Sequence, residues 1–365
     1  MKIIVTGTIG SGKSTLCKDL AALLPDFTFV SMDTMVHSLY EDSNFLACLR
    51  ASMGVNTRAE ASALVFQDPL QRRVLEELSM PFMRTKIEDA WNAPNVLTES
   101  PLLFEMTSLA GRTDLIIAVG CDDETQLQRV LVRDGMTPEK LMNIRSSQYS
   151  RELRAALADI YVDTSAGPQE YEKVLTRILH AVHMHQLEIR ARQFFGNAHI
   201  WKAIKTAYGD SARHYHALNH LHELFGYLDE HMRDHPYARA MEMAVWFHDF
   251  VYLLDPRAND GASNEARSAK EMHRLLGAYC PAWLENEHPM HAQVYLALEM
   301  IIATERHEMQ AAWVIAKTKA FEACSLFLDA DLAILAAPID RLIEYDDQIS
   351  REWLQNPGSE SMAFC

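Results

Sequence analysis

The 365-residue sequence has few cysteines and no long apolar stretch. Its six cysteines are scattered and none of them forms a CxxC pair, so we expect neither a structural zinc site nor a disulfide framework. No apolar run approaches the roughly 20 residues that span a membrane. The first residues, MKIIVTGTIG, run directly into a strand-like segment and do not resemble a signal peptide. These absences predict a cytoplasmic protein that does not bind a membrane.

The sequence also lacks an excess of basic residues. It holds 34 Lys and Arg against 50 Asp and Glu, a formal net charge of −16. Residues 1–185 carry 18 basic and 24 acidic side chains, and residues 186–365 carry 16 and 26. Neither half has the basic surplus of a dedicated nucleic-acid-binding protein, so we expect no nucleic-acid partner. A local basic cluster could still bind a small phosphate compound, and the composition sets no oligomeric state.

Strand-like segments are confined to the first half of the sequence. The β-strands are expected at 2–7, 27–33, 95–100, 114–121 and 160–165. The helices are expected at 13–24, at 59–92 as two helices broken near Pro81, and at 123–134, 138–157 and 168–185. Strands that alternate with helices are typical of a parallel sheet with helices on both faces. The first half is therefore predicted to be an α/β domain.

Only helical patterns remain after about residue 186. The helices are expected at 187–207, 213–232, 237–248, 264–278, 290–304, 310–323 and 329–354. This half also holds 12 of the 16 histidines, which indicates different chemistry in the two halves. We predict an α/β domain over 1–187 and an all-α domain over 188–365. The charged stretch HMHQLEIRARQ could instead be one continuous helix that joins them.

The stretch GTIGSGKST follows the first strand and opens the first helix. It fits the pattern G-x-x-x-x-G-K-[ST], in which glycines let backbone N–H groups turn inward around phosphate oxygens. The N-terminus of the following helix favours the same anion. Lys13 is expected to contact the β- and γ-phosphates of ATP, and the Ser14 hydroxyl to bind Mg²⁺. The predicted ATP-binding residues are Gly7, Gly10, Ser11, Gly12, Lys13, Ser14 and Thr15.

Residues further along the first half are candidates for the phosphoryl-transfer step. Asp33 ends the second strand, so we expect it at the same sheet edge as the glycine-rich loop. Its carboxylate could accept the proton of an attacking hydroxyl, or it could be a helix N-cap. An arginine cluster suits a mobile lid over the transferring phosphate, although some members could simply pair with nearby acids. The cluster comprises Arg129, Arg133, Arg145, Arg151 and Arg154.

Together these motifs resemble the dephospho-coenzyme A kinase family. The stretches TGTIGSGKST, ESPLLFEM, ETQLQRVLVRDGMT, RSSQYSRE and LADIYVDTS occur in that family's order and spacing, and VFQDPLQRRVLEELSMPFM matches its substrate-side helices. The resemblance spans residues 1 to about 185 and implies a kinase that uses ATP and Mg²⁺. It implies that Asp33 is the base, that Lys13 and Ser14 contact phosphate and metal, and that Arg133 and Arg145 are lid arginines.

The sequence departs from this family on the acceptor side. The family usually has Asp-Ala-Asp after the second strand, where this chain has Ser31-Met32-Asp33. The family's His-Pro is here Met80-Pro81, and the region after residue 37 is shortened. We therefore expect ATP as the phosphate donor, while the acceptor is either dephospho-coenzyme A or a nucleoside or nucleotide.

The histidine-rich half contains candidate metal ligands. RHYHALNHLHELFGYL holds four histidines, of which His216 and His220 are four residues apart and share a helix face. His248 and Asp249 form a polar pair inside the apolar stretch AVWFHDFVYLL, and FLDADLAIL offers two aspartates at the expected start of a later helix. A divalent cation requires several imidazoles and carboxylates that converge. The alternative for the His-Asp pair is a hydrogen-bonded pair in the core.

The order H…HD…D resembles the HD superfamily of metal-dependent phosphohydrolases, and more closely its small members with YHxLxH, FHDxVY, NEARSA and DADL motifs. The resemblance covers about residues 200–350. The ligands it implies are His220, His248, Asp249 and Asp331, with His216 and Asp329 as alternates. It implies a divalent cation, Mn²⁺, Fe²⁺, Ni²⁺ or Mg²⁺, which would acidify a bound water for attack on phosphorus.

Three further residues of this half are candidates for supporting roles. Arg213 could hold a phosphate bidentately. Glu265 could belong to the site or be only a first-turn partner of its helix dipole. His307 could bind a second metal, contact a phosphate or be an exposed helix histidine.

The sequence as a whole predicts a bifunctional enzyme of small phosphorylated compounds. A kinase half would phosphorylate a coenzyme A precursor, and a metal-dependent half would hydrolyse a phosphorylated compound. One alternative is a nucleotide kinase joined to a nucleotide phosphohydrolase. The other is a sensor in which one half is catalytically silent.

Overall fold

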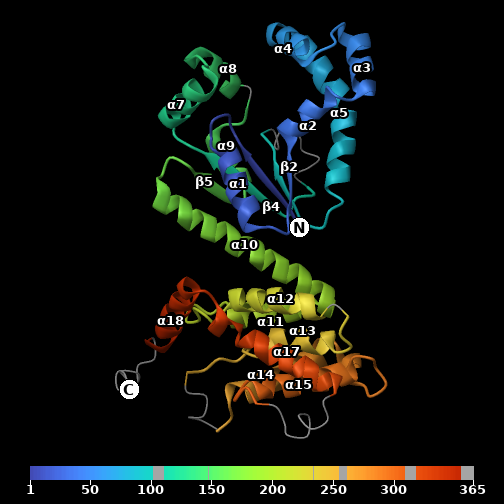
Figure 1. Cartoon of the computed structure of the whole chain (residues 1–365), viewed down its shortest axis with the longest axis vertical. Coiled ribbons are helices and arrows are strands. Elements are labelled where there is room, and N and C mark those ends of the chain that lie inside the picture. The colour runs from blue at the N-terminus through green and yellow to red at the C-terminus, as the bar shows by residue number, and fades with distance from the viewer. Residues whose placement is uncertain (102–110, 147, 233, 255–260, 309–317, 355–365) are drawn as a thin grey trace. The chain divides into compact units, whose positions relative to one another are not determined.

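The computed structural model describes residues 1–101, 111–146, 148–232, 234–254, 261–308 and 318–354 (Figure 1). Contacts divide the chain into two compact units, Met1–Val182 and His183–Cys365. Within the described ranges, no helix is long and apolar enough to cross a membrane. That residues 1–187 and 188–365 fold as independent domains stays a prediction.

The first unit is built on a five-stranded sheet in which all pairs are parallel. The strands are β1 (Lys2–Gly7), β2 (Thr28–Ser31), β3 (Val96–Glu99), β4 (Leu115–Gly120) and β5 (Ile160–Asp163), in the spatial order β2-β3-β1-β4-β5. The α/β fold class of the first half is thus confirmed. Because the order reverses at β1, the C-terminal ends of β1 and its neighbours open a crevice there. The loop after β1 therefore starts at the crevice.

Both faces of the sheet are covered by helices, because both faces of its strands are apolar. On one face Ile3 and Val5 pack with Leu16 of α1 (Lys13–Leu23) and with residues of α10 (Pro168–Phe195). On the other face Ile4 packs with Phe45 of α3 (Ser43–Met53). That second cluster also includes residues of α2 (Met32–Leu39) and α5 (Pro69–Ala90). Alternate residues of one strand thus supply two separate cores.

The helices of the first unit depart from the expected pattern at three places. The pair at 59–92 is α4 (Arg58–Gln67) and α5, so the break falls at Asp68 rather than near Pro81. Pro69 begins α5, where a missing N–H costs nothing, whereas Pro81 lies inside that helix. The expected helix 138–157 is divided into α8 (Pro138–Ser146) and α9 (Arg151–Leu157), and α7 (Asp123–Asp134) has the expected bounds. The helix α3 had not been predicted, and a helix at the position of α2 had been expected only in the alternative that makes Asp33 an N-cap.

The second unit is helical around one hydrophobic cluster. Its elements are α11 (Ala198–Tyr208), α12 (Leu218–Met232), α13 (Ala238–Phe247), α14 (Asn264–Tyr279), η1 (Pro281–Leu284), α15 (His291–Ala303), α17 (Lys319–Asp331), η2 (Ala333–Ala336) and α18 (Ile339–Leu354). The helix α13 is buried from Met243 to Phe247, which explains its apolar sequence. The expected helix 310–323 lies largely outside the described residues. Asp329 and Asp331 end α17, so the prediction that they start a helix was wrong.

The helix α10 runs through the point where the two units divide. Its first part places Leu175 and Ile178 in a core of the first unit, and its last part places Phe194 and Phe195 in the core of the second. The predicted alternative, a continuous helix through HMHQLEIRARQ, is therefore what the structure contains. Gly196, with a φ of 63°, ends this helix, because a left-handed backbone conformation favours glycine.

Candidate phosphate-binding and metal-binding sites

The glycine-rich loop lies between β1 and α1 and its glycines are required by space and conformation. A side chain at Gly7 would place a Cβ 2.4 Å from the carbonyl oxygen of Val119. Gly10 and Gly12 have φ angles of 72° and 91°, in the left-handed region that favours glycine. Among the described residues, no side chain caps the N-terminus of α1. The N–H groups at this end are thus arranged as an anion site.

Lys13 and Ser14 lie beside a carboxylate that the sequence did not single out. The Ser14 hydroxyl donates a hydrogen bond of 2.7 Å to Oε1 of Glu99, the last residue of β3. Lys13 is mostly buried; burial lowers the pKa of its ammonium group, and the carboxylates of Glu99 and Asp33 oppose that shift. Mg²⁺ is commonly bound through one or two carboxylates together with substrate phosphates. Glu99 is therefore a further carboxylate at the place where Ser14 is expected to meet the metal.

Asp33 is exposed in the first turn of α2. The N-cap of that helix is Ser31, whose Oγ accepts the N–H of Thr34 at 3.4 Å, so capping is done by another residue. Arg133 has a raised pKa, chiefly through its hydrogen bond to Asp134 but also through the charge of Asp33. The carboxylate of Asp33 thus acts electrostatically on both Lys13 and Arg133. That it is the catalytic base stays a prediction.

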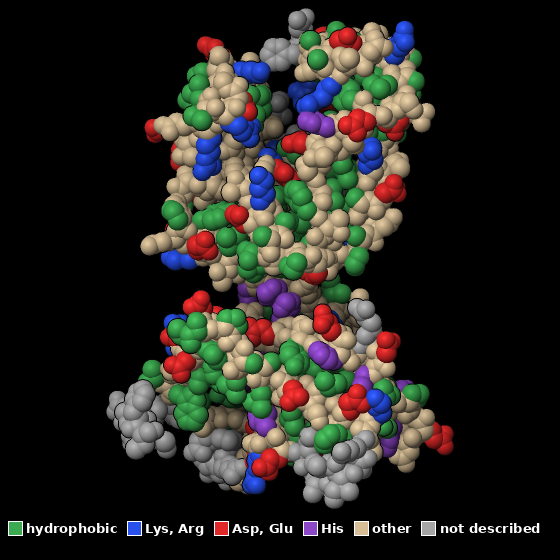
Figure 2. All heavy atoms as spheres, in the orientation of Figure 1, with side chains coloured by type: hydrophobic (Ala, Val, Ile, Leu, Met, Phe, Trp, Pro, Cys, Tyr) green, Lys and Arg blue, Asp and Glu red, His purple; other side chains and the backbone are tan. Residues whose placement is uncertain are grey.

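Two of the five arginines line the cavity at the phosphate loop. This cavity has a volume of about 830 Å³, and its walls include the loop itself, Arg129 and Arg133. Arg129 donates to Oγ1 and O of Thr164 at 2.7 and 3.0 Å. Arg133 is more exposed and forms an ion pair of 2.7 Å with Asp134. Figure 2 shows Lys and Arg side chains gathered around the hollow between the lobe of α7 and α8 and the lobe of α3 and α4.

The other three arginines lie around a second cavity of about 480 Å³. Arg145 donates to Oε1 of Gln126 at 2.7 Å, and Gln126 in turn donates to the Ile9 carbonyl of the loop at 2.6 Å. Arg145 is therefore connected to the phosphate loop through Gln126 and does not line the loop's own cavity. Arg154 is buried and donates to Thr6, which indicates a structural role. Arg151 donates to a backbone carbonyl of the loop after β4.

The parallel sheet, the glycine-rich loop at the reversal of strand order and the buried lysine define the first unit as a P-loop kinase fold. A family model described as dephospho-CoA kinase matches residues 1–170. The dephospho-CoA kinase of Rhodopseudomonas palustris is 36% identical over 189 residues, which are 48% of this chain and 93% of that protein. The corresponding enzyme of Rhizobium meliloti is 37% identical over 176 residues, 44% of this chain and 87% of that protein.

The chain belongs to the dephospho-CoA kinase family through its first half. Among solved structures, the dephospho-CoA kinase of Campylobacter jejuni is similar with a TM-score of 0.36 and 22% identity, over 49% of this chain and 96% of that one.

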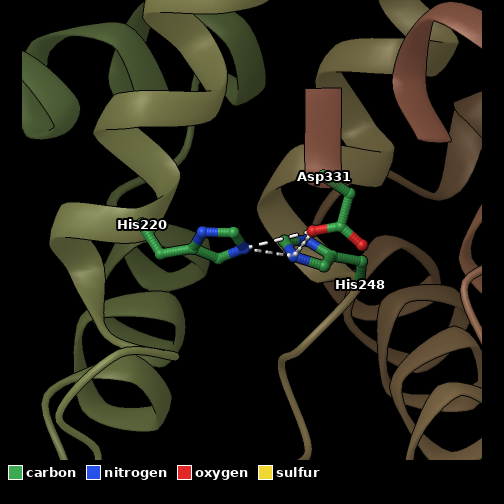
Figure 3. Close-up of side chains that lie close together, drawn as sticks. All are labelled: His220, His248 and Asp331. Atoms are coloured by element: carbon green, nitrogen blue, oxygen red, sulfur yellow. Dashed lines mark hydrogen bonds and ion pairs between the residues drawn. The ribbon is translucent and has the colours of Figure 1, made fainter. Parts of the chain in front are cut away.

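The second unit brings together residues from three separate helices. His220 comes from α12, His248 follows α13 as its C-cap, and Asp331 ends α17. His220 is 4% exposed and His248 1% exposed. One ligand atom from each of the three residues lies within 4.8 Å of the others. Figure 3 shows the three side chains pointing toward one another.

The contacts within this cluster are short. Nε2 of His220 lies 3.1 Å from Nε2 of His248 and 3.2 Å from Oδ1 of Asp331. Nε2 of His248 lies 3.5 Å from the same Oδ1. Asp249 is adjacent, with its Oδ2 3.1 Å from Nε2 of His248 and 3.8 Å from Nε2 of His220. We name these four histidine and aspartate residues, His220, His248, Asp249 and Asp331, the HD cluster after their one-letter codes.

The two alternates lie outside the set of close contacts, although the ring of His216 is 6.1 Å from that of His220. His216 does not share the close contacts of the cluster: its Nδ1 pairs with Oε2 of Glu352 at 2.8 Å, and its ring stacks on Tyr252. Asp329 is exposed, two residues before Asp331 on α17. The geometry therefore favours His220 over His216 and Asp331 over Asp329 as ligands.

The donor set and its hydrogen bonds fit a divalent cation. Nδ1 of His248 lies 3.1 Å from the carbonyl oxygen of Val245, so an Nδ1–H can donate there and leave the Nε2 lone pair facing His220. Either an Nε2–H of His220 donates to this lone pair, or a cation between the two rings accepts both of them. Burial by itself lowers the pKa of His248, but the carboxylates of Asp249 and Asp331 outweigh it and raise the pKa to about 9. The two carboxylates therefore favour positive charge at this place.

The three supporting candidates have distinct surroundings. Arg213 donates to the carbonyls of Asp249 and Phe250 at 2.7 and 3.0 Å, so its guanidinium holds the backbone after α13 instead of presenting a free fork for phosphate. Glu265 lies in the first turn of α14, where its negative charge can interact favourably with the helix dipole. His307 contacts the cluster: its Nε2 is 3.1 Å from Oδ2 of Asp331.

Two residues of the NEARSA motif that were not predicted as site residues, Asn264 and Ser268, bind the segment that follows the His-Asp pair. Asn264 accepts the N–H of Leu253 and donates to the Leu253 carbonyl, at 3.0 and 2.9 Å. Ser268 accepts the N–H of Val251 at 2.9 Å. The sequence signal that could have identified them is the presence of Asn and Ser in the motif, since the side chains of these residues commonly bond backbone groups.

Proposed function

We propose that the first unit transfers the γ-phosphoryl group of ATP to dephospho-CoA. The observation that carries this proposal is family membership over nearly the full length of the relatives, together with the phosphate loop geometry. The choice of dephospho-CoA as the acceptor rests on family membership alone, because the departures at Ser31-Met32-Asp33 and Met80-Pro81 lie on the acceptor side. A nucleoside or nucleotide is the alternative acceptor.

Each residue of the first unit has a role in this proposal. The N–H groups at the start of α1 and the Lys13 ammonium would hold the β- and γ-phosphates. Mg²⁺ would neutralise charge on the transferring group, held by Ser14 with Glu99 beside it. Asp33 would take the proton of the attacking hydroxyl, and Arg133 would approach the developing charge from α7. Arg145 would act through Gln126 on the loop.

A substrate panel tests the acceptor. The full-length protein is incubated with ATP and Mg²⁺ and with dephospho-CoA, nucleosides or nucleoside monophosphates, and products are identified by mass spectrometry. We expect turnover with dephospho-CoA that Lys13→Ala abolishes. Turnover with a nucleoside compound alone would replace the proposed acceptor. ATP-dependent turnover that survives in Lys13→Ala would contradict the assignment of the loop.

We further propose that the second unit is an HD-type, divalent-metal-dependent phosphohydrolase of a small phosphorylated compound. The observation that supports it is the convergence of two buried imidazoles and two carboxylates from distant parts of the chain. His220, His248, Asp249 and Asp331 would hold the cation, which when bound would supply an acidified water and charge neutralisation. The Val245 carbonyl, 3.1 Å from Nδ1 of His248, would hold that ring with Nε2 directed at the cation, and Arg213 holds the backbone of Asp249.

Metal analysis distinguishes this proposal from the alternative in which His248 and Asp249 are only a hydrogen-bonded pair in the core. Purified protein is exposed to Mn²⁺, Fe²⁺, Ni²⁺ or Mg²⁺, and bound metal is measured by mass spectrometry in the wild type, His248→Ala and Asp249→Ala. We expect about one ion per chain that both variants lose, and hydrolysis of a phosphorylated compound that requires it. The matched control, Asp329→Ala, should keep the ion. A wild type that binds none of these metals would reject the HD assignment and leave a silent second unit.

A further inference from the structure

The helix α18, the last helix of the described residues, is attached to the second unit by polar contacts. Among the described residues, none of α18 belongs to the hydrophobic core of this unit or to the partly buried residues that pack against it. Arg341 pairs with Glu223 of α12 at 2.9 Å, and the ring of Tyr345 meets that of Tyr215 edge to face at 4.6 Å. By contrast, α13 is buried along most of its length.

Glu352, near the end of α18, makes the strongest of these contacts. Its Oε1 accepts the backbone N–H groups of His214, Tyr215 and His216 at 2.7, 2.8 and 3.0 Å. Its Oε2 faces Nδ1 of His216 at 2.8 Å, and the residue is 1% exposed. Three successive N–H groups that converge on one oxygen form an anion-binding nest. The carboxylate therefore anchors α18 to the segment just before α12.

The helix also borders a cavity that reaches the HD cluster. This cavity has a volume of about 290 Å³ and includes His220 among its lining residues. Tyr215, Leu224 and Tyr227 form aromatic and apolar parts of its wall, and Arg341 of α18 forms another part. Displacement of α18 would remove Arg341 from this wall and widen access to His220.

Such a displacement would cost little apolar burial. The apolar side chains Ile339, Ile343 and Leu354 of α18 are already 68%, 62% and 76% exposed. The ion pair of Arg341 with Glu223 is partly exposed, and pairs of this kind contribute little to stability. The hydrogen bonds of Glu352 can be exchanged for bonds to water. Segments held in this way open locally, well before the core unfolds.

We propose that α18 is a displaceable lid over the cavity at His220, with Glu352 as its latch. Opening of the lid would admit a phosphorylated compound to the HD cluster and closure would shield the cluster from water. The identity of the admitted compound rests on the proposed phosphohydrolase, whereas the lid itself rests on the contacts of α18.

Hydrogen–deuterium exchange with mass spectrometry tests the lid on the full chain, without metal or substrate. In the wild type, we expect amides of α18 to exchange at least about tenfold faster than those of α13 and α15. Glu352→Ala should accelerate exchange in α18 by a further 10- to 100-fold or so, the loss expected for hydrogen bonds to a charged group. Exchange in α13 and α15 should be unchanged. Asp346→Ala, an exposed acid on the same helix, is the matched control and should change nothing.

Equal protection of α18 and α13 in the wild type would overturn the proposal, as would acceleration of all helices together in Glu352→Ala. If that variant does not fold, limited trypsin digestion of the wild type decides: the lid predicts first cleavage after Arg341 or Arg351 in a unit that otherwise stays intact. First cleavage elsewhere in the second unit would reject it. Because neither metal nor hydrolysis is measured, failure of the phosphohydrolase proposal would leave this result unaffected.

Discussion

The two candidate sites of this protein are assembled in different ways. The phosphate site is largely one contiguous segment, Gly7 to Thr15, supported by Glu99 and the arginines of α7. The HD cluster draws on α12, α13 and α17, and its residues span positions 220 to 331. Phosphate binding by a contiguous loop depends mainly on the conformation of that loop, because its own backbone N–H groups contact the phosphate. A dispersed cluster exists only when the helices pack, so its function depends on the stability of the whole unit.

This difference predicts that the two sites respond differently to perturbation. Changes at the phosphate site should alter catalysis with little effect on stability. Changes at the HD cluster or its supports should alter metal binding and stability together.

The largest effect is expected from Asp33→Asn in the first unit. Loss of a general base typically lowers turnover by 10²- to 10⁴-fold, and Asp33 is exposed, so the fold should be preserved. Steady-state kinetics alongside an ATP titration would show a large fall in kcat with unchanged ATP affinity. Asp26→Asn, an acid near the opposite end of β2, is the control. A loss of less than about tenfold would remove Asp33 from the catalytic role.

A somewhat smaller effect is expected when the pH is lowered, which should reduce the folding stability of the second unit. Burial raises the pKa of Glu352, but its hydrogen bond to His216, the charge of that imidazole and the backbone N–H groups outweigh burial and lower the pKa from 4.5 to about 2. A depressed carboxyl pKa stabilises the folded state above pH 4.5, and this contribution is lost as the pH falls toward 2. The shift corresponds to roughly 3 kcal/mol.

The measurement compares wild type and Glu352→Gln by denaturant unfolding between pH 7 and pH 2. The wild type should lose more stability over this interval, and the two proteins should converge at the acid end. Parallel pH profiles would show that the carboxylate contributes no stability. The acids of the HD cluster titrate in both proteins and therefore cancel in the comparison.

Cation binding should stabilise the second unit selectively. A ligand at 100 times its dissociation constant stabilises the folded state by about 2.7 kcal/mol. Mn²⁺ without nucleotide should therefore raise the melting transition of the second unit and leave that of the first unit in place, as followed by calorimetry. His248→Ala should not respond. An equal shift of both transitions, or of the variant, would indicate binding outside the HD cluster.

The smallest effect is expected at His307, which hydrogen-bonds Oδ2 of Asp331. Partners that orient a ligand typically contribute 10- to 100-fold to metal affinity, and the partial exposure of His307 places it at the lower end of that range. Titration of His307→Ala with Mn²⁺ should show affinity reduced by about tenfold, while His231→Ala, an exposed histidine of α12, should bind normally. Complete loss of binding would instead make His307 a direct ligand.

Local sequence patterns predicted the structure correctly where neighbouring residues decide it. The five strands were found because apolar runs such as KIIVTG need no partner to be recognised. The expected bounds of α7 were also correct, and in the structure Asp122 caps this helix and Gly135 ends it. The predicted break near Pro81 was wrong, because Pro81 lies inside α5. The prediction that Asp331 starts a helix was also wrong, because α17 begins at Lys319 and ends at Asp331.

The choice between alternates required the fold. His216 and His220 share a helix spacing, so only packing shows that His220 faces His248 while His216 faces Glu352. Arg213 looked like a phosphate ligand, yet in the structure it holds the backbone of Asp249. Glu99 and Glu352 were not found because their partners, Ser14 and the segment 214–216, lie far away in the sequence.

By itself, the sequence determined that the first half is an α/β unit with a phosphate loop, because glycine spacing and strand periodicity act over a few residues. It also determined the order of histidines and aspartates in the second half. Only the tertiary structure decided which of those side chains converge and how a carboxylate 136 residues away anchors the segment before α12. The physical reason is that convergence depends on the packing of α12, α13 and α17 around one apolar core, and such packing has no signature in local sequence.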